Sequence, residues 1–386
     1  MGPAILRSMI RPGRHLLPSI AVVWWLAVPA SAQALFPTDG LEDRIDFWKQ
    51  VFTKYGADDV IVHDRFHVNL IYAIADEDSA ERTMRHVKDS LLEIRDGLSS
   101  DAELSDAALK IRQAIVDAGL EPSASLLDEL SDRIHTQRGV KERFRSGIIR
   151  SGRYVDSFQK IMEDHGSPAA LALLPLVESS YENARSVAAA VGVWQFTRPT
   201  SRDYLVVNRR VDERLDPMKS AHAAAKLLKD NYDALGTWPL AITAYNHGRG
   251  GMLRAKAEQG PELPAIISEY RSPLFGYASM NFYSEFLAAI DVYEHRQDYF
   301  GTLTLDRPSA PAPVNVVATA KAAETVRVEK TTATRPTPPR TTSYTVRRGD
   351  TLSEIAQRFR TSIQQLTSKN KLAGHSIYAG QILIIR

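Results

Sequence analysis

The 386-residue sequence predicts a mainly α protein with more than one domain, because a chain of this length exceeds one compact core. Apolar residues recur at helical spacing through most of the stretch from Phe36 to Asp298, which predicts a helical N-terminal region and then an all-α domain. The segment after Leu305 is rich in Pro, Ala, Thr and Val and predicts a disordered linker. Periodicity returns from residue 343 onward as a strand, two short helices and a closing strand, which predicts a small βααβ domain.

The first 32 residues have the pattern of a signal peptide. Three arginines precede an apolar run from Leu16 to Val28, which ends in Ala30-Ser-Ala32. A basic start, a short apolar stretch and an A-x-A site predict export with cleavage after Ala32; an uncleaved membrane anchor is the alternative. The chain has no cysteine, so we expect neither a lipid anchor nor disulfides. The pattern predicts a periplasmic protein without a transmembrane anchor in its mature chain.

The N-terminal region, residues 33–136, is predicted to be helical apart from one short strand at Asp59–His63. Nothing in this region points to a reaction. His63 and His67 are a weak indication of metal binding, and packed or surface positions are the preferred interpretation. We expect no metal and no cofactor.

Helix signals divide the domain predicted at residues 137–302. Ser167-Pro168 predicts one helix start and Asp216-Pro217 another, with Gly236 ending the second helix. Thr237-Trp-Pro239 predicts a further helix that ends near Asn246.

Glu178 is the candidate catalytic residue of this domain. It follows Leu174 by four residues and Leu171 by seven, so a continuous helix places the three on one face. Desolvation on an apolar face raises the pKa of a carboxyl group, which suits a general acid that works near neutral pH. Spacing alone also allows a capped or ion-paired structural glutamate.

Glu178 lies in the first of several ordered motifs. They are Leu174-Pro-Leu-Val-Glu-Ser179, Ser186-Val-Ala-Ala-Ala-Val-Gly-Val-Trp-Gln195 and Ala244-Tyr-Asn246, with Val211-Asp-Glu-Arg-Leu-Asp-Pro217 and Asn281-Phe-Tyr-Ser-Glu-Phe286 in further support. Together they resemble the soluble lytic transglycosylase family, which shares the fold of goose-type lysozyme. The resemblance covers about half of the chain and implies a lysozyme-like all-α catalytic domain.

The resemblance assigns roles to individual residues. Glu178 matches the only catalytic acid and base of the family. Ser186 and Gln195 match residues that line the sugar subsites, Tyr245 and Asn246 match a pair that positions the reacting sugar, and Tyr283 matches a tyrosine whose hydroxyl faces the glutamate. The alternatives are that the two tyrosines are core aromatics and that Gln195 is a buried amide serving the backbone. Trp194 is expected to be packing.

Two departures from the family pattern stand close to Glu178. Ala189 replaces a glycine, which is costly if the backbone there requires a positive φ. Thr197-Arg198 replaces the usual Met-Pro, with Pro199 one place later, and predicts a local change of loop.

The reaction implied by the resemblance is cleavage of the β-1,4 bond between N-acetylmuramic acid and N-acetylglucosamine, with 1,6-anhydromuramic ends as the product. Most glycosidases use two acids, yet Glu182 is the only other acid between Glu178 and Gln195 and lies too close to face it. Asp212 and Asp216 are expected to form a salt bridge and an N-cap. A hydrolytic muramidase on the same fold and a non-catalytic wall-binding protein remain the alternatives.

The last domain, residues 343–386, resembles a LysM module. Its motifs are Tyr344-Thr-Val-Arg-Arg-Gly-Asp-Thr-Leu352, Asn370 and Tyr378-Ala-Gly-Gln-Ile-Leu-Ile384. The resemblance implies glycan contacts at Asp350, Thr351, Leu352, Ile377 and Tyr378, while Ile355 and Leu366 are expected in the core. Residues 303–342 tether this module, which raises the local substrate concentration. Peptidoglycan glycan strands are thus the expected partner, and a net charge of +2 gives no support to nucleic-acid binding.

Overall fold

The structure, a computed structural model, describes part of the chain. The described residues are 35–100, 103–186, 189–308, 343–346, 355–356, 359, 361, 363–370 and 381–385. The predicted signal peptide at residues 1–32 and most of the predicted linker lie outside them, as do the predicted LysM contacts Asp350, Thr351, Leu352, Ile377 and Tyr378.

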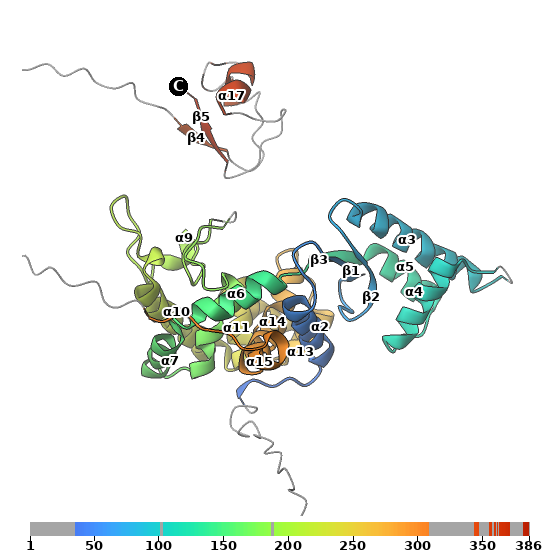
Figure 1. The fold of residues 1–386 in the computed structure, drawn as a ribbon, viewed down its shortest axis with the longest axis horizontal. Helices are drawn as coiled ribbons and strands as arrows, with labels where there is room; N and C mark the ends of the chain where they lie inside the picture. The colour runs from blue at the N-terminus through green and yellow to red at the C-terminus, as the bar shows by residue number, and fades with distance from the viewer. Residues whose placement is uncertain are drawn as a thin grey trace, which may run out of the picture. The chain divides into compact units, whose positions relative to one another are not determined.

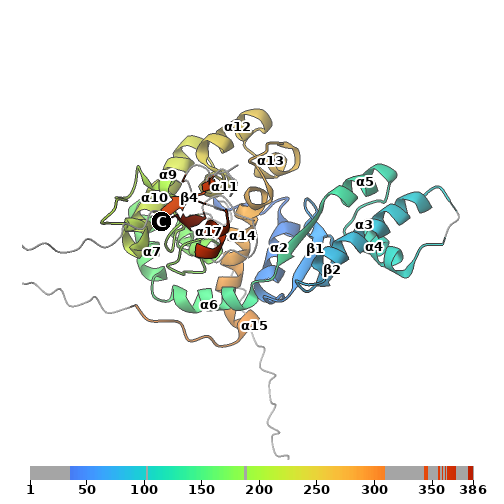
Figure 2. The same cartoon turned by 90° about the horizontal axis from the view of Figure 1, so that it is seen from above.

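The described residues fall into two compact units. The first takes its residues from Met1–Gln50, Val60–Gln137 and Asp230–Ala288, and the second from Val51–Asp59, Arg138–Lys229 and Ala289–Arg386. Helices dominate in Figures 1 and 2, which confirms the mainly α class. Within the described ranges, no helix combines the length and the apolarity that crossing a bilayer requires.

The first unit contains a sheet that the sequence predicted only in part. Its N-terminal elements are α2 (Glu42–Thr53), β1 (Val60–Asp64), β2 (Ile71–Ala75), α3 (Ala80–Gly97), α4 (Asp106–Asp117), α5 (Ala124–Asp132) and β3 (Ile134–Arg138). The strand order is β2-β1-β3, with β1 and β2 antiparallel. The prediction found β1, which is buried along its length, and missed β2 and β3, which are mostly half-buried. A helical N-terminal region was therefore an incomplete prediction, because a five-residue apolar run such as β2 does not distinguish strand from helix.

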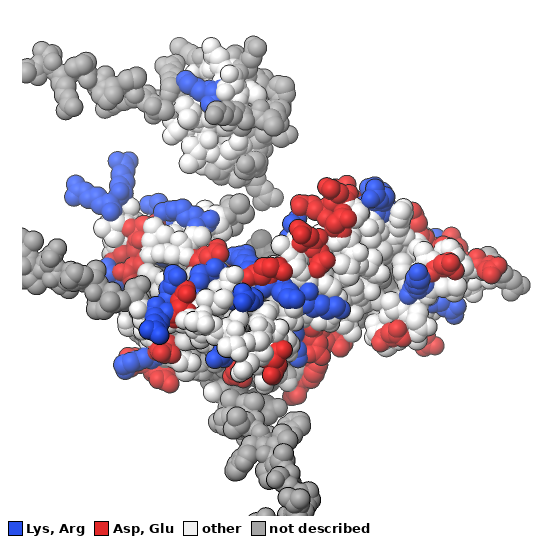
Figure 3. Space-filling view, viewed as in Figure 1, with Lys and Arg blue, Asp and Glu red and all other residues white. Residues whose placement is uncertain are grey.

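Helices α3, α4 and α5 lie side by side in both views and share a core with the sheet (Figures 1 and 2). Leu91, Ile115, Leu127 and Val62 are among its fully buried members. Ser105 caps α4, because its hydroxyl accepts a hydrogen bond from the Ala108 amide at 3.2 Å. Asp and Glu side chains are frequent on the outer surface of this part (Figure 3).

Further helices complete the first unit. They are α11 (Trp238–His247), α12 (Arg249–Gln259), α13 (Leu263–Glu269) and most of α14 (Tyr277–Glu294). The predicted helix after Thr237 is α11, and Gly248 at φ 93° separates it from α12. Polar bonds hold α14 to the N-terminal part, since Arg44 donates to the Asn281 side chain at 2.8 Å.

The second unit carries most of the residues around Glu178. Its elements are α6 (Lys141–Ser151), α7 (Val155–Asp164), the 3-10 helix η1 (Ala169–Leu173), α8 (Pro175–Glu178), α9 (Arg198–Ser201), the 3-10 helix η2 (Glu213–Leu215), most of α10 (Pro217–Leu235) and α15 (Arg296–Phe300). Asp216 caps α10 as predicted, accepting from the Met218 and Lys219 amides at 3.0 Å. The predicted start at Ser167-Pro168 was wrong in detail, because Pro168 is the N-cap of η1 and the Ser167 hydroxyl has no partner.

The described part of the C-terminal domain contains β4 (Ser343–Thr345), α17 (Ile363–Lys369) and β5 (Ile382–Ile384). The two strands pair antiparallel, with Tyr344 opposite Leu383. Asn370 joins the helix to the strand, because its amide donates to the Ile384 carbonyl at 3.0 Å and accepts from the Ile384 amide at 2.7 Å. Ile355 and Leu366 lie in the core as predicted.

Candidate active site

Glu178 stands at the end of a helical segment that a proline divides. Pro175 has no N–H and cannot continue the hydrogen-bond ladder of η1, so a new short helix, α8, begins there and ends at Glu178. Leu171 and Leu174 are fully buried as the spacing predicted, although they belong to two helical pieces rather than one. The burial of these pieces fixes the position of the Glu178 backbone.

Backbone strain is concentrated in the segment that follows Glu178. All four non-glycine residues with positive φ in the described ranges lie here: Ser180 (52°), Tyr181 (57°), Ala189 (62°) and Gln195 (48°). Such conformations cost about 1–3 kcal/mol each and persist only where surrounding contacts hold them. These four residues therefore keep their conformations at a cost in local stability.

Tyr181 and Arg150 hold the first part of this strained segment. The Tyr181 ring is buried and lies parallel to Phe158, and its hydroxyl donates to the Ala172 carbonyl at 2.6 Å. Arg150 on α6 donates to the Ser180 carbonyl at 2.9 Å and pairs with Glu182 at 3.1 Å. The sequence reasoning missed Arg150, which carries no local motif.

Ser179 joins Glu178 to the second motif. Its hydroxyl donates to the Val193 carbonyl at 2.7 Å, so the motif that ends in Gln195 lies against the end of α8. Gly192 permits a close approach, because a Cβ atom there would be 1.8 Å from the Arg214 carbonyl oxygen. Arg214 is buried and forms two hydrogen bonds to Asp212 at 2.9 Å. The salt-bridge role predicted for Asp212 is confirmed.

Gln195 is half-buried and satisfies the backbone with one end of its amide. Its Nε2 donates to the Gly192 carbonyl at 2.7 Å and to the Ala184 carbonyl at 3.3 Å. Its Oε1 accepts no hydrogen bond from a described residue. The neighbouring Trp194 is fully buried against Phe158, which confirms packing as its role.

Ser186 is exposed and organises the turn that contains Ala189. Its hydroxyl accepts from the Ala190 amide at 3.2 Å, and its carbonyl accepts from the Ala189 amide at 3.0 Å. The φ of 62° at Ala189 shows that alanine stands where glycine is conformationally cheaper. The cost anticipated for this departure is present in the structure.

The Glu178 carboxyl has the electrostatic environment of a neutral acid. Burial raises its pKa from 4.5 to about 8, and no charge adds to this effect. Among the described residues of the second unit, no side chain pairs with the carboxyl or donates a hydrogen bond to it. Glu182, the only other acid between Glu178 and Gln195, is instead held by Arg150.

The other residues predicted for the catalytic site belong to the first unit. Tyr245 and Asn246 occupy the last turn of α11, where Asn246 is exposed and accepts a hydrogen bond from Ser279 at 3.1 Å. Tyr283 is 1% exposed on α14, and its hydroxyl donates to the Pro37 carbonyl at 3.0 Å. Within the first unit, this hydroxyl therefore has the Pro37 carbonyl as its partner.

His63 on β1 is a residue of the core. His63 is fully buried, where its Nδ1 lies 2.8 Å from the Asp64 carbonyl and its ring packs on Phe47. The part of the chain that the structure describes contains no group of three or more His, Cys, Asp or Glu side chains arranged to hold an ion. Packing, the preferred interpretation of His63, is confirmed.

Comparison with known proteins identifies two domains in this chain. The family model "Transglycosylase SLT domain" matches residues 157–266, which include Glu178, Gln195 and Asn246. The family model "LysM domain" matches residues 344–386. The chain contains a transglycosylase SLT domain and a LysM domain. The family resemblance found in the sequence motifs is thereby confirmed, and the protein is an enzyme with a transglycosylase SLT domain.

Comparison with curated proteins gives three relatives. The membrane-bound lytic murein transglycosylase D of Escherichia coli is 28% identical over 313 residues, which cover 66% of this chain and 69% of the relative. A stretch of 46 residues, 12% of this chain, is 46% identical to an autolysin of Enterococcus faecalis and covers 6% of that protein. A stretch of 43 residues, 11% of this chain, is 51% identical to the uncharacterized protein YkzQ of Bacillus subtilis and covers 57% of it.

Proposed function

We propose that this protein is a periplasmic lytic transglycosylase that cleaves peptidoglycan with Glu178 as its single catalytic acid and base. The SLT domain and the lytic murein transglycosylase among its relatives support the enzyme class and the peptidoglycan substrate. The raised pKa of Glu178, together with the lack of a described partner for its carboxyl, carries the assignment of the residue. A structural glutamate with a salt bridge or a cap would have a lowered pKa instead.

The bond that breaks is the β-1,4 linkage between N-acetylmuramic acid and N-acetylglucosamine. Protonated Glu178 gives its proton to the glycosidic oxygen as the bond from C1 of the muramic acid to this oxygen breaks. The 2-acetamido group of the same sugar stabilises C1. The Glu178 carboxylate then takes the proton of the C6 hydroxyl while the oxygen of that hydroxyl forms a bond to C1. This step closes the 1,6-anhydro ring and consumes no water. The carboxyl ends protonated, as it began.

A pKa of about 8 suits the first half of this cycle, because most Glu178 carboxyls hold a proton at neutral pH. In the second half of the cycle Glu178 is a carboxylate, and the positive charge on the oxocarbenium-like sugar beside it compensates its negative charge. The ion pair of Glu182 with Arg150 leaves that carboxylate unsuited to hold an attacking water. A single available acid therefore favours intramolecular attack over hydrolysis.

The other site residues are proposed to bind sugar. The Gln195 Oε1 is oriented by two backbone bonds of its Nε2 and accepts a hydroxyl or acetamido proton. Ser186 and Asn246 are exposed polar groups, and Tyr245 is half-buried beside Asn246. Tyr283 is buried, so we assign it a positioning role through Pro37. We propose that the LysM domain holds glycan strands, with Asp350, Thr351, Leu352, Ile377 and Tyr378 as contacts.

Mass spectrometry of the muropeptides that the chain from residue 33 onward releases from purified sacculi tests the proposal. We expect products one water lighter than hydrolysis yields. Glu178→Gln should reduce their release by about 10²–10⁴-fold, whereas Glu163→Gln, an exposed acid on α7, should leave it unchanged. Hydrated reducing ends would make the protein a muramidase. No release by the unmodified chain, together with intact binding to sacculi, would favour a non-catalytic wall-binding protein.

A further inference from the structure

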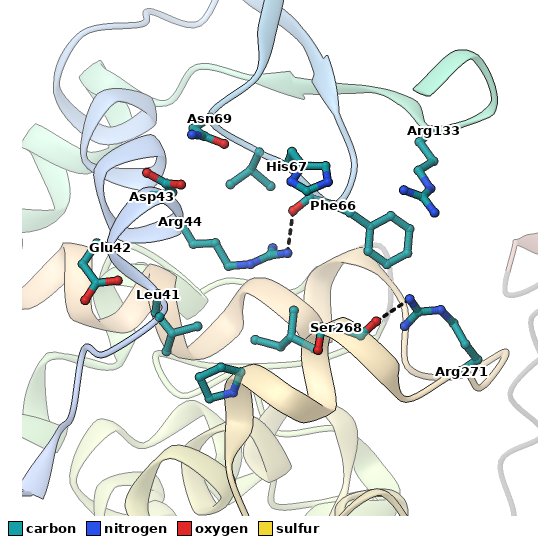
Figure 4. A pocket seen from close by; sticks show the side chains of 14 residues that line it. Leu41, Glu42, Asp43, Arg44, Phe66, His67, Asn69, Arg133, Ser268 and Arg271 are labelled. Carbon is teal, nitrogen blue, oxygen red and sulfur yellow. Dashed lines mark hydrogen bonds between the residues drawn. The ribbon is translucent and has the colours of Figure 1, made fainter. Parts of the chain in front are cut away.

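A cavity of about 550 Å³ lies within the first unit, apart from every residue proposed for sugar cleavage. The start of α2, the loop between β1 and β2, the residue before β3, and α13 with the residue that follows Tyr270 surround it (Figure 4). These segments are distant in the sequence and meet only in the folded unit. The volume is within the range of small-ligand sites.

Arg44 is a buried cation of this cavity that forms no direct ion pair with a described carboxylate. Arg44 is 9% exposed, and its guanidinium donates hydrogen bonds to the Asn281 Oδ1 at 2.8 Å and to the Phe66 carbonyl at 2.7 Å. Both acceptors are neutral, and no described carboxylate lies within ion-pair distance. Burial lowers the pKa of Arg44 to about 10, so the guanidinium remains charged at neutral pH. The charges of Asp64 and Asp43 stabilise the guanidinium, but neither carboxylate forms an ion pair with it. A buried charge without a directly paired counter-charge is unfavourable, and an anionic group of a ligand would supply that pair.

Two further arginines reach the same cavity through Phe66. The guanidinium carbons of Arg133 and Arg271 each lie 4.9 Å from the centre of its ring. Cation–π contact of this kind orients a guanidinium and leaves its edge N–H groups available. Arg133 is paired with Glu129, but Arg271 is exposed and donates only to the carbonyls of Ser268 and Tyr270. The guanidinium groups of Arg44 and Arg271 thus form no ion pair with a described carboxylate.

Acidic side chains line the cavity too. Glu42 and Asp43 are exposed in the first turn of α2 and lie across the view of Figure 4 from Arg133 and Arg271. They would repel a purely anionic ligand such as phosphate. A ligand with carboxylates at one end and an ammonium group at the other satisfies both sides.

We propose that this cavity binds the peptide part of peptidoglycan, with a peptide carboxylate at Arg44 and Arg271 and an ammonium group at Glu42 and Asp43. The proposal rests on the proposed function for its substrate class. The glycan is a neutral polyol along most of its length and gives no reason for unpaired guanidinium groups, whereas peptide stems carry carboxylates and an amine. The cavity would then favour glycan strands that bear peptides with free carboxylates.

Isothermal titration calorimetry tests this proposal with a free peptide. The probe is N-acetyl-alanyl-γ-D-glutamyl-lysyl-D-alanine, compared with the same peptide amidated at its C-terminus, and the protein is the chain from residue 33 onward. We expect the peptide acid to bind about tenfold more tightly than the amide, as loss of one charge-assisted pair implies. Arg271→Gln should weaken binding of the acid by a similar factor and remove the difference between acid and amide.

Arg112→Gln is the matched control, because Arg112 is an exposed arginine on α4 that does not line the cavity. It should bind the acid as the unmodified chain does. Equal affinity for acid and amide, no effect of Arg271→Gln, or tighter binding of inorganic phosphate than of the peptide would each overturn the proposal. The probe contains no sugar, so its binding is independent of muropeptide release, and failure of either experiment leaves the other interpretable.

Discussion

Replacing Glu178 by glutamine is expected to make the protein more stable at alkaline pH while it strongly reduces activity. Burial raises the pKa of this carboxyl to about 8 in the folded protein, whereas in the unfolded chain it keeps the ordinary value of 4.5. Between these two values the folded state binds more protons than the unfolded state. Linkage then requires that folding stability falls as pH rises from about 4.5 to 8. Glutamine does not titrate, so the variant escapes this loss.

The magnitude follows from the same two pKa values. Each pKa unit corresponds to about 1.4 kcal/mol, so the interval from 4.5 to about 8 sets a ceiling of about 5 kcal/mol. Glu178 is half-buried rather than sealed, and solvent screening reduces the figure. We therefore expect Glu178→Gln to be about 2–3 kcal/mol more stable than the unmodified chain at pH 9 and nearly equal to it at pH 4.5. The difference corresponds to a rise in Tm of about 4–10 °C at pH 9.

Urea unfolding followed by far-UV circular dichroism at pH 4.5, 7 and 9 and constant ionic strength measures the effect. Glu163→Gln is the control, since this acid is exposed on α7 and should change stability little at any of the three values. The reasoning is refuted if Glu178→Gln is destabilised equally at all three pH values, or if its stability relative to the unmodified chain does not rise with pH.

Three further predictions concern the strained segment beside Glu178, each measured as the change in unfolding free energy in urea. Gly192→Ala should destabilise by about 3 kcal/mol or more, because its Cβ would be 1.8 Å from the Arg214 carbonyl oxygen at a φ of 85°; near-neutrality would show that the backbone yields easily. Asp212→Asn should cost about 2–3 kcal/mol, because it leaves the buried Arg214 without its counter-charge, and an unchanged midpoint would contradict this role. Ala189→Gly should stabilise by about 0.5–1 kcal/mol through relief of the positive φ; a loss of stability would argue that the methyl group makes favourable contacts.

The backbone strain after Glu178 and the raised pKa of its carboxyl have the same structural origin. Short helical pieces and residues with positive φ place Ser179 and Tyr181 into buried hydrogen bonds directly after Glu178, whose own carboxyl is desolvated by burial. The local conformations are unfavourable by themselves, and buried contacts such as the Arg214–Asp212 pair offset their cost. We expect variants that relax this segment to gain stability and to lower the pKa of Glu178.

Several features followed from the sequence because they depend on neighbours along the chain. A proline at the first helical position with an aspartate before it predicts the start of α10 at Pro217, and the structure agrees. The spacing of leucines placed Leu171 and Leu174 in the core beside Glu178. The ordered motifs around Glu178 identified the enzyme class, since no folding information is needed to recognise them.

Other features were decided only by tertiary structure. Local patterns predicted neither β2 nor β3, because β3 consists of mixed polar residues and is a strand only where β1 supplies hydrogen bonds. The positive φ of Ala189 depends on a turn closed by Ser186. The raised pKa of Glu178 depends on how completely other segments exclude water from its carboxyl. The arginine cavity combines Arg44, Phe66, Arg133 and Arg271 from distant parts of the chain. Spacing describes which residues share a face, whereas desolvation and ion pairing depend on what the fold brings against that face.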